Sequence, residues 1–471
     1  KILCILNFLL QMHRSSRRLF KLLQQPVNFA QNPQFAALVQ LNKSFISSSA
    51  IQMSKFGLPK RLQGSAPSVW NEYIALALEY KPLNLGQGFP DDACPAYVTD
   101  ALASIAKSSN PLLQQYTRGF GHLRLVQAIS KLYSKLVDRP INPLSEVLIT
   151  SGAYEALYSA IQGHVDVGDE VIIMEPFFDC YEPMVKMAGG VPRFIPLKPN
   201  KTEGTITSAN WVFDETELEK LFNEKTKMII LNTPHNPIGK VFNCQELEKI
   251  AELCRKWNVL CLSDEVYEWM TFDKAEHVRI CTLPGMWERT ITIGSAGKTF
   301  SVTGWKIGWA YAPANLIVNM QMVHQNSVYT CPTPLQEAVA QSFELEIERL
   351  GTPECFFHSL PCELKVKRDF MAKFLSDAGM KPTVPEGGYF MLADWTNLGI
   401  KKININSELD KYRDYKFTKW MTKNVGLQGI PPSAFYGEAN KHLGENYVRY
   451  CYIKKQENLE KAAQLLQKFK G

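Results

Sequence analysis

The stretch Gly294-Ser-Ala-Gly-Lys-Thr-Phe-Ser301, followed by Gly304-Trp-Lys-Ile-Gly308, decides how this sequence is interpreted. It overlaps the end of the run Thr290–Ser295, whose length and composition are typical of a buried strand. The strand therefore delivers Ser295 and Lys298 into a loop that contains glycine. A lysine at this place either contacts a phosphate group or acts as a reactive amine, and the rest of the chain must distinguish the two.

A phosphate-binding P-loop is the first alternative, because Gly297-Lys-Thr299 matches the end of that motif. The complete motif needs a glycine five residues before Gly297. Position 292 is threonine, and Gly294 lies too close. The spacing therefore disfavours a P-loop ATPase and favours a lysine that forms a Schiff base with pyridoxal phosphate (PLP).

Strand-like runs recur along the chain from about residue 145 and alternate with segments of helical periodicity. In one such segment, Asn243 and Glu246 have the spacing of an N-cap and capping box. Alternation of this kind predicts an α/β fold with a mainly parallel central sheet and helices on both faces. Ligands of such folds bind at the carboxyl ends of the strands. Besides Thr290–Ser295, the expected strands are Val147–Ser151, Glu170–Met174, Met228–Asn232 and Val259–Asp264.

The pattern changes after about residue 330, where longer helical segments surround the expected strands Gly388–Asp394 and Tyr447–Tyr452. This change predicts a second, smaller α/β domain. We expect a leader over 1–52, an N-terminal arm over 53–95 that contributes to the small domain and the active site, a large domain over 96–345 and a small domain over 346–471.

Candidate PLP ligands follow several of the expected strands. Asp264 ends one strand and can hold the ring nitrogen protonated, which makes the ring an electron sink. Tyr267 and Asn236 can each hydrogen-bond the phenolic oxygen of the ring. Ser151-Gly-Ala153 opens an expected helix, where free N–H groups favour a phosphate, and Ser295 and Lys306 add a hydroxyl and a cation.

Further segments resemble one enzyme family closely: Asn84-Leu-Gly-Gln-Gly-Phe-Pro-Asp91, Glu175-Pro-Phe-Phe-Asp-Cys-Tyr-Glu-Pro183 and Leu283-Pro-Gly-Met-Trp-Glu-Arg289. From about Leu58 to the C-terminus, the chain is similar to kynurenine aminotransferases. That family is also called glutamine transaminase K or cysteine-S-conjugate β-lyase, and it belongs to the class I/II aminotransferases of PLP fold type I. The resemblance implies this fold, PLP as cofactor and a homodimer with active sites at the interface.

The resemblance also implies roles around the cofactor. Lys298 would be the Schiff-base lysine, Asp264 would pair with the ring nitrogen, and the phenolic oxygen would contact Asn236 and Tyr267. Phe178 would stack on the ring. The phosphate or its rim would be surrounded by Ala153, Tyr154, Ser295 and Lys306, and Tyr116 would reach the cofactor phosphate of the partner subunit.

For the substrate, the resemblance implies that Arg449 binds the α-carboxylate, assisted by Asn236 and Gly88. A guanidinium fork suits a carboxylate because it donates two parallel hydrogen bonds. From the residues alone, however, an ion pair at a strand edge is the simpler interpretation of Arg449. The side-chain pocket would be lined by Trp70, Tyr116 and Tyr154.

Four positions depart from the family pattern. Position 153 is Ala instead of Gly, His235 stands where Asn is common, and Lys306 replaces an Arg. These three leave PLP binding intact as an expectation. Thr330 replaces a His that the partner subunit offers to the substrate, so substrate preference stays open.

The expected reaction transfers the amino group of kynurenine, glutamine or an aromatic amino acid to a 2-oxo acid, and yields kynurenate from kynurenine. In it, Lys298 moves the Cα proton and Asp264 keeps the ring cationic. Two alternatives stay open. One is β-elimination from cysteine conjugates, which uses the same residues. The other is a non-catalytic PLP-fold binding protein, which the presence of Lys298 and Asp264 disfavours.

The charge of the chain is concentrated in the leader. The formal net charge is +6, from 52 Lys and Arg against 46 Asp and Glu, and residues 1–52 hold six basic and no acidic residues. The body is therefore neutral, which argues against a nucleic-acid partner. A basic, Ser-rich, acid-free leader predicts a mitochondrial presequence, with a cytoplasmic form from Met53 as the alternative. No apolar run is long enough to span a membrane, and the 11 Cys suggest neither disulfides nor a metal site.

Overall fold

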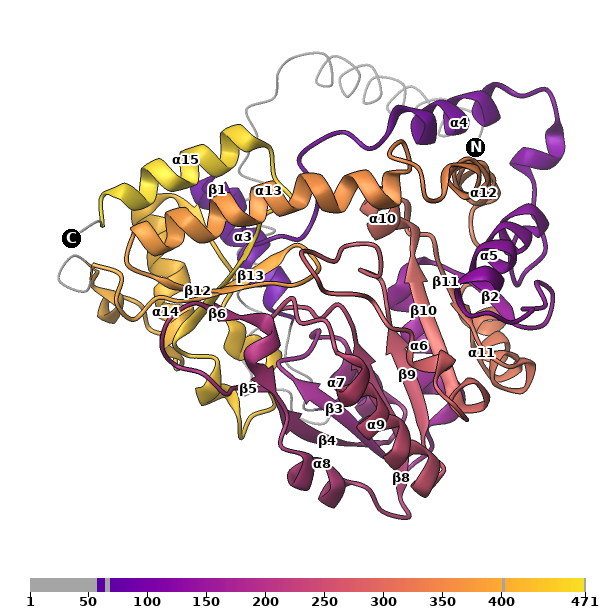
Figure 1. The fold of residues 1–471 in the computed structure, drawn as a ribbon, viewed down its shortest axis with the longest axis horizontal. Helices are drawn as coiled ribbons and strands as arrows, with labels where there is room; N and C mark the ends of the chain where they lie inside the picture. Colours follow the sequence, from indigo (N-terminus) through magenta and orange to yellow (C-terminus); the bar gives the residue numbers. More distant parts are fainter. Residues whose placement is uncertain (1–56, 64–67, 400–402, 470–471) are drawn as a thin grey trace, which may run out of the picture. The chain divides into compact units, whose positions relative to one another are not determined.

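The computed structural model describes residues 57–63, 68–399 and 403–469 (Figure 1). The predicted leader and the alternative start at Met53 lie outside the described residues. Residues Pro59–Gly471 form one compact unit, and the predicted domain boundaries within it stay predictions. Among the described helices, none combines the length and the apolar character needed to cross a bilayer.

The centre of the fold is a seven-stranded sheet in the order β2-β11-β10-β9-β8-β3-β4. Only β11 runs antiparallel to its neighbours; the other pairs are parallel, so the predicted mainly parallel sheet is confirmed. The bounds are β2 (Val147–Thr150), β3 (Glu170–Glu175), β4 (Val191–Pro196), β8 (Thr226–Asn232), β9 (Leu260–Asp264), β10 (Thr290–Ser295) and β11 (Gly308–Tyr311).

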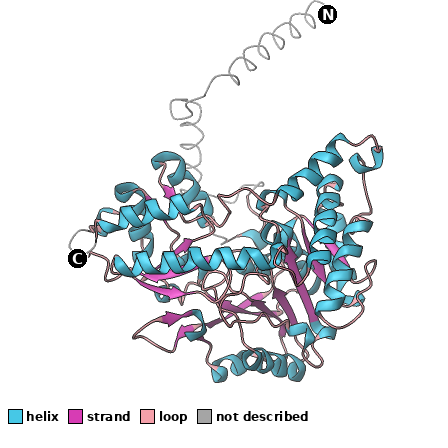
Figure 2. Ribbon diagram, turned by 45° about the horizontal axis from the view of Figure 1, so that its top comes forward, coloured by secondary structure: helices cyan, strands magenta, loops and turns pink. Residues whose placement is uncertain are grey.

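Both faces of this sheet are buried, because successive side chains of a strand enter different hydrophobic clusters. On β3, Val171 and Ile173 pack in a cluster with residues of α6, whereas Ile172 and Met174 pack with residues of α9. Helices accordingly surround the strands in Figure 2. Burial on both faces explains why the sequences of these strands are continuous apolar runs instead of alternating apolar and polar residues.

The helices around the sheet follow the predicted periodicity. In α9 the Asn243 side chain accepts from the Glu246 N–H at 2.9 Å, and the Glu246 carboxylate accepts from the Asn243 N–H at 3.0 Å, which confirms the capping box. The bounds are α4 (Ala96–Lys107), α5 (Leu123–Leu136), α6 (Gly152–His164), α7 (Tyr181–Met187), α8 (Glu215–Leu221), α9 (Cys244–Trp257), α10 (Ala296–Thr299), α11 (Ala314–Ser327) and α12 (Thr333–Arg349).

A second sheet has four strands in the order β15-β13-β12-β6. Its strands are β6 (Ile206–Thr207), β12 (Lys381–Val384), β13 (Phe390–Asp394) and β15 (Tyr447–Cys451). The long helix α13 contacts β12 and β13, and it also packs against α15. The helices of this part are α13 (Phe356–Asp377), α14 (Arg413–Trp420) and α15 (Gln456–Gln467).

The segment that precedes α4 joins the C-terminal part of the chain. After α3 (Val69–Tyr80), the short strand β1 (Leu83–Asn84) pairs in parallel with β14 (Leu427–Gln428). The remaining short pair is antiparallel and joins β5 (Lys198–Pro199) to β7 (Trp211–Val212). The β1 pairing holds the loop that follows it, residues 85–91, close to β13 and β15.

The parallel strands end together at one edge of the central sheet. The register pairs Asp264, the last residue of β9, with Asn232 on β8 and with Ile293 on β10. Ser295 at the end of β10 lies opposite Gly308 at the start of β11, and Gly308 lies opposite Thr150 at the end of β2. Residues that are far apart in the sequence are therefore neighbours at this edge.

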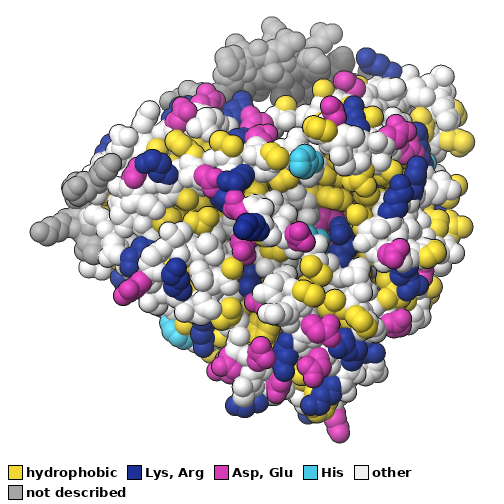
Figure 3. Space-filling view, viewed as in Figure 1, with side chains coloured by type: hydrophobic (Ala, Val, Ile, Leu, Met, Phe, Trp, Pro, Cys, Tyr) yellow, Lys and Arg dark blue, Asp and Glu magenta, His cyan; other side chains and the backbone are white. Residues whose placement is uncertain are grey.

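The surface carries charges of both signs. On the face seen in Figure 3, basic and acidic side chains of the described residues are interspersed. This distribution agrees with the neutral charge balance of the chain beyond residue 52. The described cysteines carry free thiols.

Candidate active site

A cavity of about 370 Å³ lies at the edge where the parallel strands end. Its wall comes from the strand ends, the start of α6, the loop after β1, and residues of β13 and β15. Twelve of the thirteen site residues predicted from the sequence line it: Trp70, Gly88, Ala153, Tyr154, Phe178, Asn236, Asp264, Tyr267, Ser295, Lys298, Lys306 and Arg449.

One end of the cavity forms a cradle for an anion. Helix α6 begins here with Gly152 in the left-handed region (φ +74°), and the first turn leaves backbone N–H groups without helical partners. A side chain at Gly308 could not be accommodated, because its Cβ would lie 2.5 Å from the backbone nitrogen of Ala153. The Lys306 amine and the Ser295 hydroxyl belong to the same wall, so a cation and a donor complete the cradle.

Asp264 is a buried carboxyl group at the end of β9, with 4% of its surface exposed. The Tyr181 hydroxyl donates a hydrogen bond of 2.6 Å to it. Burial raises the pKa of Asp264 to about 6, although the hydrogen bond from Tyr181 opposes this shift. Among the described residues, no basic side chain lies within ion-pair distance of Asp264. A cationic group bound in the cavity would therefore stabilise its ionised form.

Lys298 lies in the short helix α10 and points its amine into the cavity. The amine donates to the Tyr389 hydroxyl at 2.5 Å and more weakly to the Gly88 carbonyl oxygen at 3.4 Å. Burial lowers the pKa of the Lys298 amine to about 8. A substantial fraction of the amine is therefore neutral near physiological pH, and only the neutral amine can act as a nucleophile or base.

Arg449 is fully buried in the middle of β15. Its guanidinium donates to the Asn236 side-chain oxygen at 3.0 Å and to the Gly86 carbonyl oxygen at 2.8 Å, and its Nε atom has no partner. In the described part of the chain, no carboxylate forms an ion pair with it, so the strand-edge ion pair considered from the sequence is wrong. The reason is that β15 places Arg449 in the buried wall of the cavity instead of at the surface.

Aromatic rings surround the guanidinium and line the rest of the cavity. The Arg449 guanidinium carbon lies 4.0 Å from the Phe390 ring centroid and 5.1 Å from the Trp70 centroid. Burial lowers the pKa of Arg449 to about 10. Tyr154 and Phe178 meet edge to face with centroids 6.1 Å apart. These rings give the cavity an apolar aromatic surface beside a positive charge, which suits an amino acid with an aromatic side chain.

Tyr116 is the one predicted site residue outside the cavity. It is 82% exposed and packs edge to face against Tyr329, whose own side chain is 59% exposed. Thr330 follows Tyr329 and lies outside the cavity wall too. In one copy of the chain, the cavity is therefore built without these three residues.

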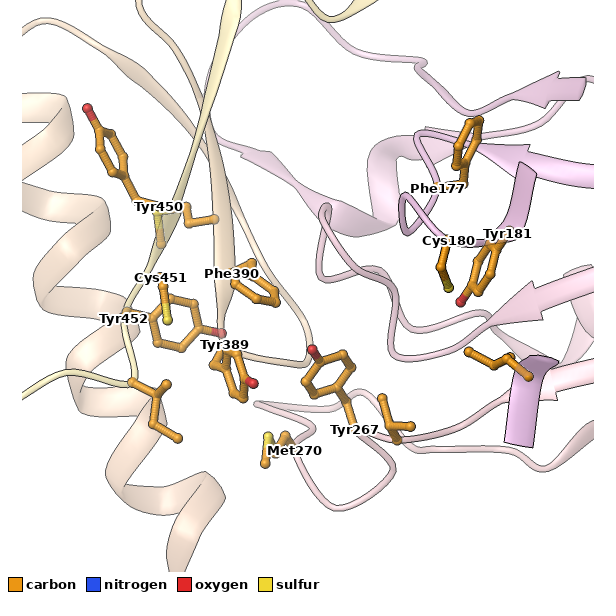
Figure 4. Packing of buried hydrophobic residues seen from close by; sticks show 14 of the residues in the cluster. Phe177, Cys180, Tyr181, Tyr267, Met270, Tyr389, Phe390, Tyr450, Cys451 and Tyr452 are labelled. Atoms are coloured by element: carbon orange, nitrogen blue, oxygen red, sulfur yellow. The ribbon is translucent and has the colours of Figure 1, made fainter. Parts of the chain in front are cut away.

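Among the residues not predicted from the sequence, Phe390 lies in the cavity wall, and Tyr389 and Tyr181 contact Lys298 and Asp264. Figure 4 shows Tyr389 and Tyr267 facing one another, and their ring centroids lie 5.0 Å apart. Gly387 and Gly388, which precede Tyr389, were a usable signal, because glycines before a strand permit close backbone approach. Tyr181, which reaches Asp264 from α7, lies within the family-like segment Glu175–Pro183, but no role was assigned to it from the sequence.

Comparison with known proteins gives consistent results. A family model described as aminotransferase class I and II matches residues 80–466. Kynurenine–oxoglutarate transaminase 3 from Mus musculus is 55% identical and covers 89% of this chain and 92% of its own length. Kynurenine–oxoglutarate transaminase 1 from Rattus norvegicus is 45% identical, with 89% and 99% covered. The structure of Bna3p from Saccharomyces cerevisiae superimposes with a TM-score of 0.82 at 32% identity, over 88% of this chain and 99% of that one.

Proposed function

Because the chain belongs to the class I and II aminotransferase family, we propose that it uses PLP to transfer the α-amino group of kynurenine to a 2-oxo acid. The buried guanidinium of Arg449 carries this proposal. A fully buried charge without a counter-ion is costly, and both substrates of the reaction supply a carboxylate. The Arg449 fork can bind that carboxylate through two parallel hydrogen bonds.

The donor set at the cavity fits PLP. The cradle at Gly152 and Gly308 offers N–H groups, a hydroxyl and the Lys306 cation to a phosphate. Asp264, buried and without a basic partner among the described side chains, suits a protonated ring nitrogen. Lys298 offers a partly neutral amine to an aldehyde. Two of these residues differ from the family pattern. Ala153 instead of Gly keeps the backbone N–H donor of the cradle, and Lys306 instead of Arg keeps its positive charge.

PLP, when bound, supplies an electron-withdrawing ring that accepts the electron pair of the breaking Cα–H bond. Asp264 keeps a negative charge beside the ring nitrogen and so favours its protonated form. Arg449 and Asn236 fix the substrate carboxylate, which sets the direction of the Cα–H bond. The Lys298 amine, once free, takes the Cα proton and later returns a proton, and its lowered pKa suits both transfers.

Kynurenine as amino donor is supported by the aromatic wall and by the names of the relatives reported above. The test is a panel assay with kynurenine, glutamine, phenylalanine and a cysteine conjugate, each with several 2-oxo acids. We expect turnover of kynurenine with kynurenate as product. No turnover of kynurenine beside rapid turnover of another amino acid would contradict the proposed substrate. The assay with the cysteine conjugate measures the rate of β-elimination and so tests the β-lyase alternative.

Arg449→Lys should lower kcat/KM for kynurenine by about 10- to 100-fold. Lysine keeps the positive charge, but it cannot donate two parallel hydrogen bonds to one carboxylate. The matched control is Arg193→Lys, because Arg193 forms a half-exposed ion pair with Glu170 at 3.5 Å and should leave kcat/KM unchanged. Steady-state kinetics measure both variants. Wild-type kcat/KM in the Arg449 variant would exclude this residue as the carboxylate clamp.

A homodimer is part of the proposal. Tyr116, Tyr329 and Leu112 are large side chains that expose 82%, 59% and 71% of their surface. The rings of Tyr116 and Tyr329 contact one another. Exposed apolar side chains in contact are typical of protein interfaces, and Tyr116 would reach the cofactor phosphate of a second copy. Light scattering should give the mass of two chains. A fully active monomer would contradict the dimer.

We also propose that residues 1–52 direct the chain to the mitochondrial matrix. The composition of this segment supports the proposal: it has six basic residues, no acidic residue and a Ser-rich end. Tagged versions of the full chain and of a chain that starts at Met53 test this. The full chain should co-purify with mitochondria and the shorter one should stay in the cytosol. Equal cytosolic distribution of both would contradict import.

A further inference from the structure

The Lys298 amine has a specific partner in Tyr389, which the proposed catalytic scheme does not use. Tyr389 immediately precedes β13, and its hydroxyl accepts from the Lys298 amine at 2.5 Å. The same hydroxyl donates to the Gly88 carbonyl oxygen at 2.9 Å. The Tyr389 hydroxyl therefore donates its proton to the Gly88 carbonyl oxygen and accepts a hydrogen bond from the Lys298 amine through a lone pair.

The surroundings of Tyr389 hold its side chain in place and keep its phenol protonated. The side chain is 1% exposed, and its ring packs against Tyr267 and Phe390 with centroids 5.0 and 4.8 Å away. Burial raises the pKa of the Tyr389 phenol well above its ordinary value, so the phenol keeps its proton. A buried, protonated phenol with a fixed acceptor cannot serve as a base, but it can hold a neighbouring amine in one place.

We propose that Tyr389 is a positioning residue that holds the Lys298 amine whenever this amine is not bonded to the cofactor. The inference rests on the proposed function, because a PLP-dependent cycle frees the lysine when the substrate binds and bonds it to the cofactor again at the end. The free amine must then stay beside the substrate Cα atom. A hydrogen bond to Tyr389 reduces the conformations that its long side chain samples and favours the productive one.

The same contact links Lys298 to the carboxylate site. Tyr389 binds the Gly88 carbonyl, and Arg449 binds the Gly86 carbonyl two residues earlier at 2.8 Å. At Gly88, an added Cβ would lie 2.4 Å from the Phe390 ring, so the loop sits directly on β13. Residues 86–88 thus hold the Lys298 amine, which moves the proton, in a defined place relative to the Arg449 guanidinium, which binds the substrate carboxylate.

The key experiment compares Tyr389→Phe with the matched control Tyr452→Phe. Tyr452 is equally buried, and its hydroxyl donates to the Gly388 carbonyl oxygen at 2.8 Å. Both variants lose one hydroxyl and one hydrogen bond to a glycine carbonyl, but only Tyr389 contacts the Lys298 amine. The primary readout is the rate at which full-length, cofactor-free protein develops its visible absorption band after PLP is added, measured as a function of pH.

In the wild type, this rate should rise with pH through about 8, as the Lys298 ammonium loses its proton. Besides Tyr389, the charged or titratable groups that act on this amine come from β9, the loop after β9, β15 and the loop before β11: Asp264, Tyr267, Arg449, Cys451 and Lys306. Both variants retain them all. The Tyr389 hydroxyl accepts a hydrogen bond that stabilises the ammonium, so its loss should shift the midpoint down by about one pH unit.

Tyr452→Phe should keep the wild-type midpoint. Tyr389→Phe should also lower kcat about tenfold with the KM for kynurenine unchanged, because the Arg449 contacts remain. Coincident pH profiles for Tyr389→Phe and the wild type would overturn the proposal. No visible band in wild-type protein supplied with PLP would instead overturn the proposed function, so the two failures are distinguishable.

A second measurement needs no variant. A crystal structure of the wild-type chain with pyridoxamine phosphate should show the free Lys298 amine within about 3.2 Å of the Tyr389 hydroxyl. An amine that points away from Tyr389 in that structure would overturn the proposal, even if Tyr389→Phe fails to fold.

Discussion

Lys298→Ala should lower the rate of amino transfer at least about a thousandfold. In the proposed mechanism the Lys298 amine, which lies in the cavity wall, carries the Cα proton, and general base catalysis contributes about a hundredfold to ten-thousandfold. Alanine also removes the group that would bond the cofactor. The visible spectrum of PLP added to the variant should therefore resemble that of free PLP.

The measurement for this variant combines a single-turnover assay with a visible spectrum. The control is Lys373→Ala, since Lys373 lies on α13 with 72% of its side chain exposed, in an ion pair with Asp377 at 2.8 Å. This control should match the wild type in both readouts. More than a tenth of wild-type activity in Lys298→Ala would show that another group carries the proton.

Asp264→Asn should lower the rate about a hundredfold to a thousandfold, with little change in protein stability. Asparagine has nearly the same shape and can still accept the hydrogen bond from Tyr181. It carries no negative charge, however, so it cannot favour a protonated ring nitrogen. Loss of a preorganised electrostatic contact of this kind has about that effect on kcat.

The pH dependence of cofactor binding tests the same residue. In the cofactor-free chain, the pKa of Asp264 is raised to about 6. Below about this pH the carboxyl gains a proton, so the affinity of the wild type for PLP should fall as the pH falls through this value. Asp264→Asn should lack that dependence. Asp377→Asn, which alters a surface pair on α13, is the control that should retain it, and a pH dependence unchanged in Asp264→Asn would contradict the assignment.

The strands of the central sheet were largely predictable from the sequence. Thr290–Ser295 has the expected bounds, and the expected strand Val259–Asp264 begins one residue later in the structure. Both runs are apolar on both faces because helices cover both sides of the sheet. Asn243 and Glu246 fix the start of α9 for a local reason, since each satisfies a backbone N–H of the other.

Contacts between distant segments were not predictable in the same way. Tyr389 meets Lys298 from 91 positions away in the sequence, and Tyr181 meets Asp264 from 83 positions away. No local periodicity encodes either contact. The first depends on how the residue before β13 packs against α10, and the second on how α7 packs beside β9. Arg449 shows the converse. A charged residue in a strand suggests a surface ion pair, and only the packing of β15 reveals a buried guanidinium that forms no ion pair with any described carboxylate.

The most direct test of the central claim follows the nitrogen atom itself. Purified protein with PLP receives kynurenine that carries heavy nitrogen in its α-amino group, together with an unlabelled 2-oxo acid, and mass spectrometry measures the products. We predict that the label appears in the amino acid formed from the 2-oxo acid, in step with kynurenate, and that Lys298→Ala forms neither product at a comparable rate. Kynurenine that stays intact, or label released as ammonia, would contradict the assignment of this chain as a kynurenine aminotransferase.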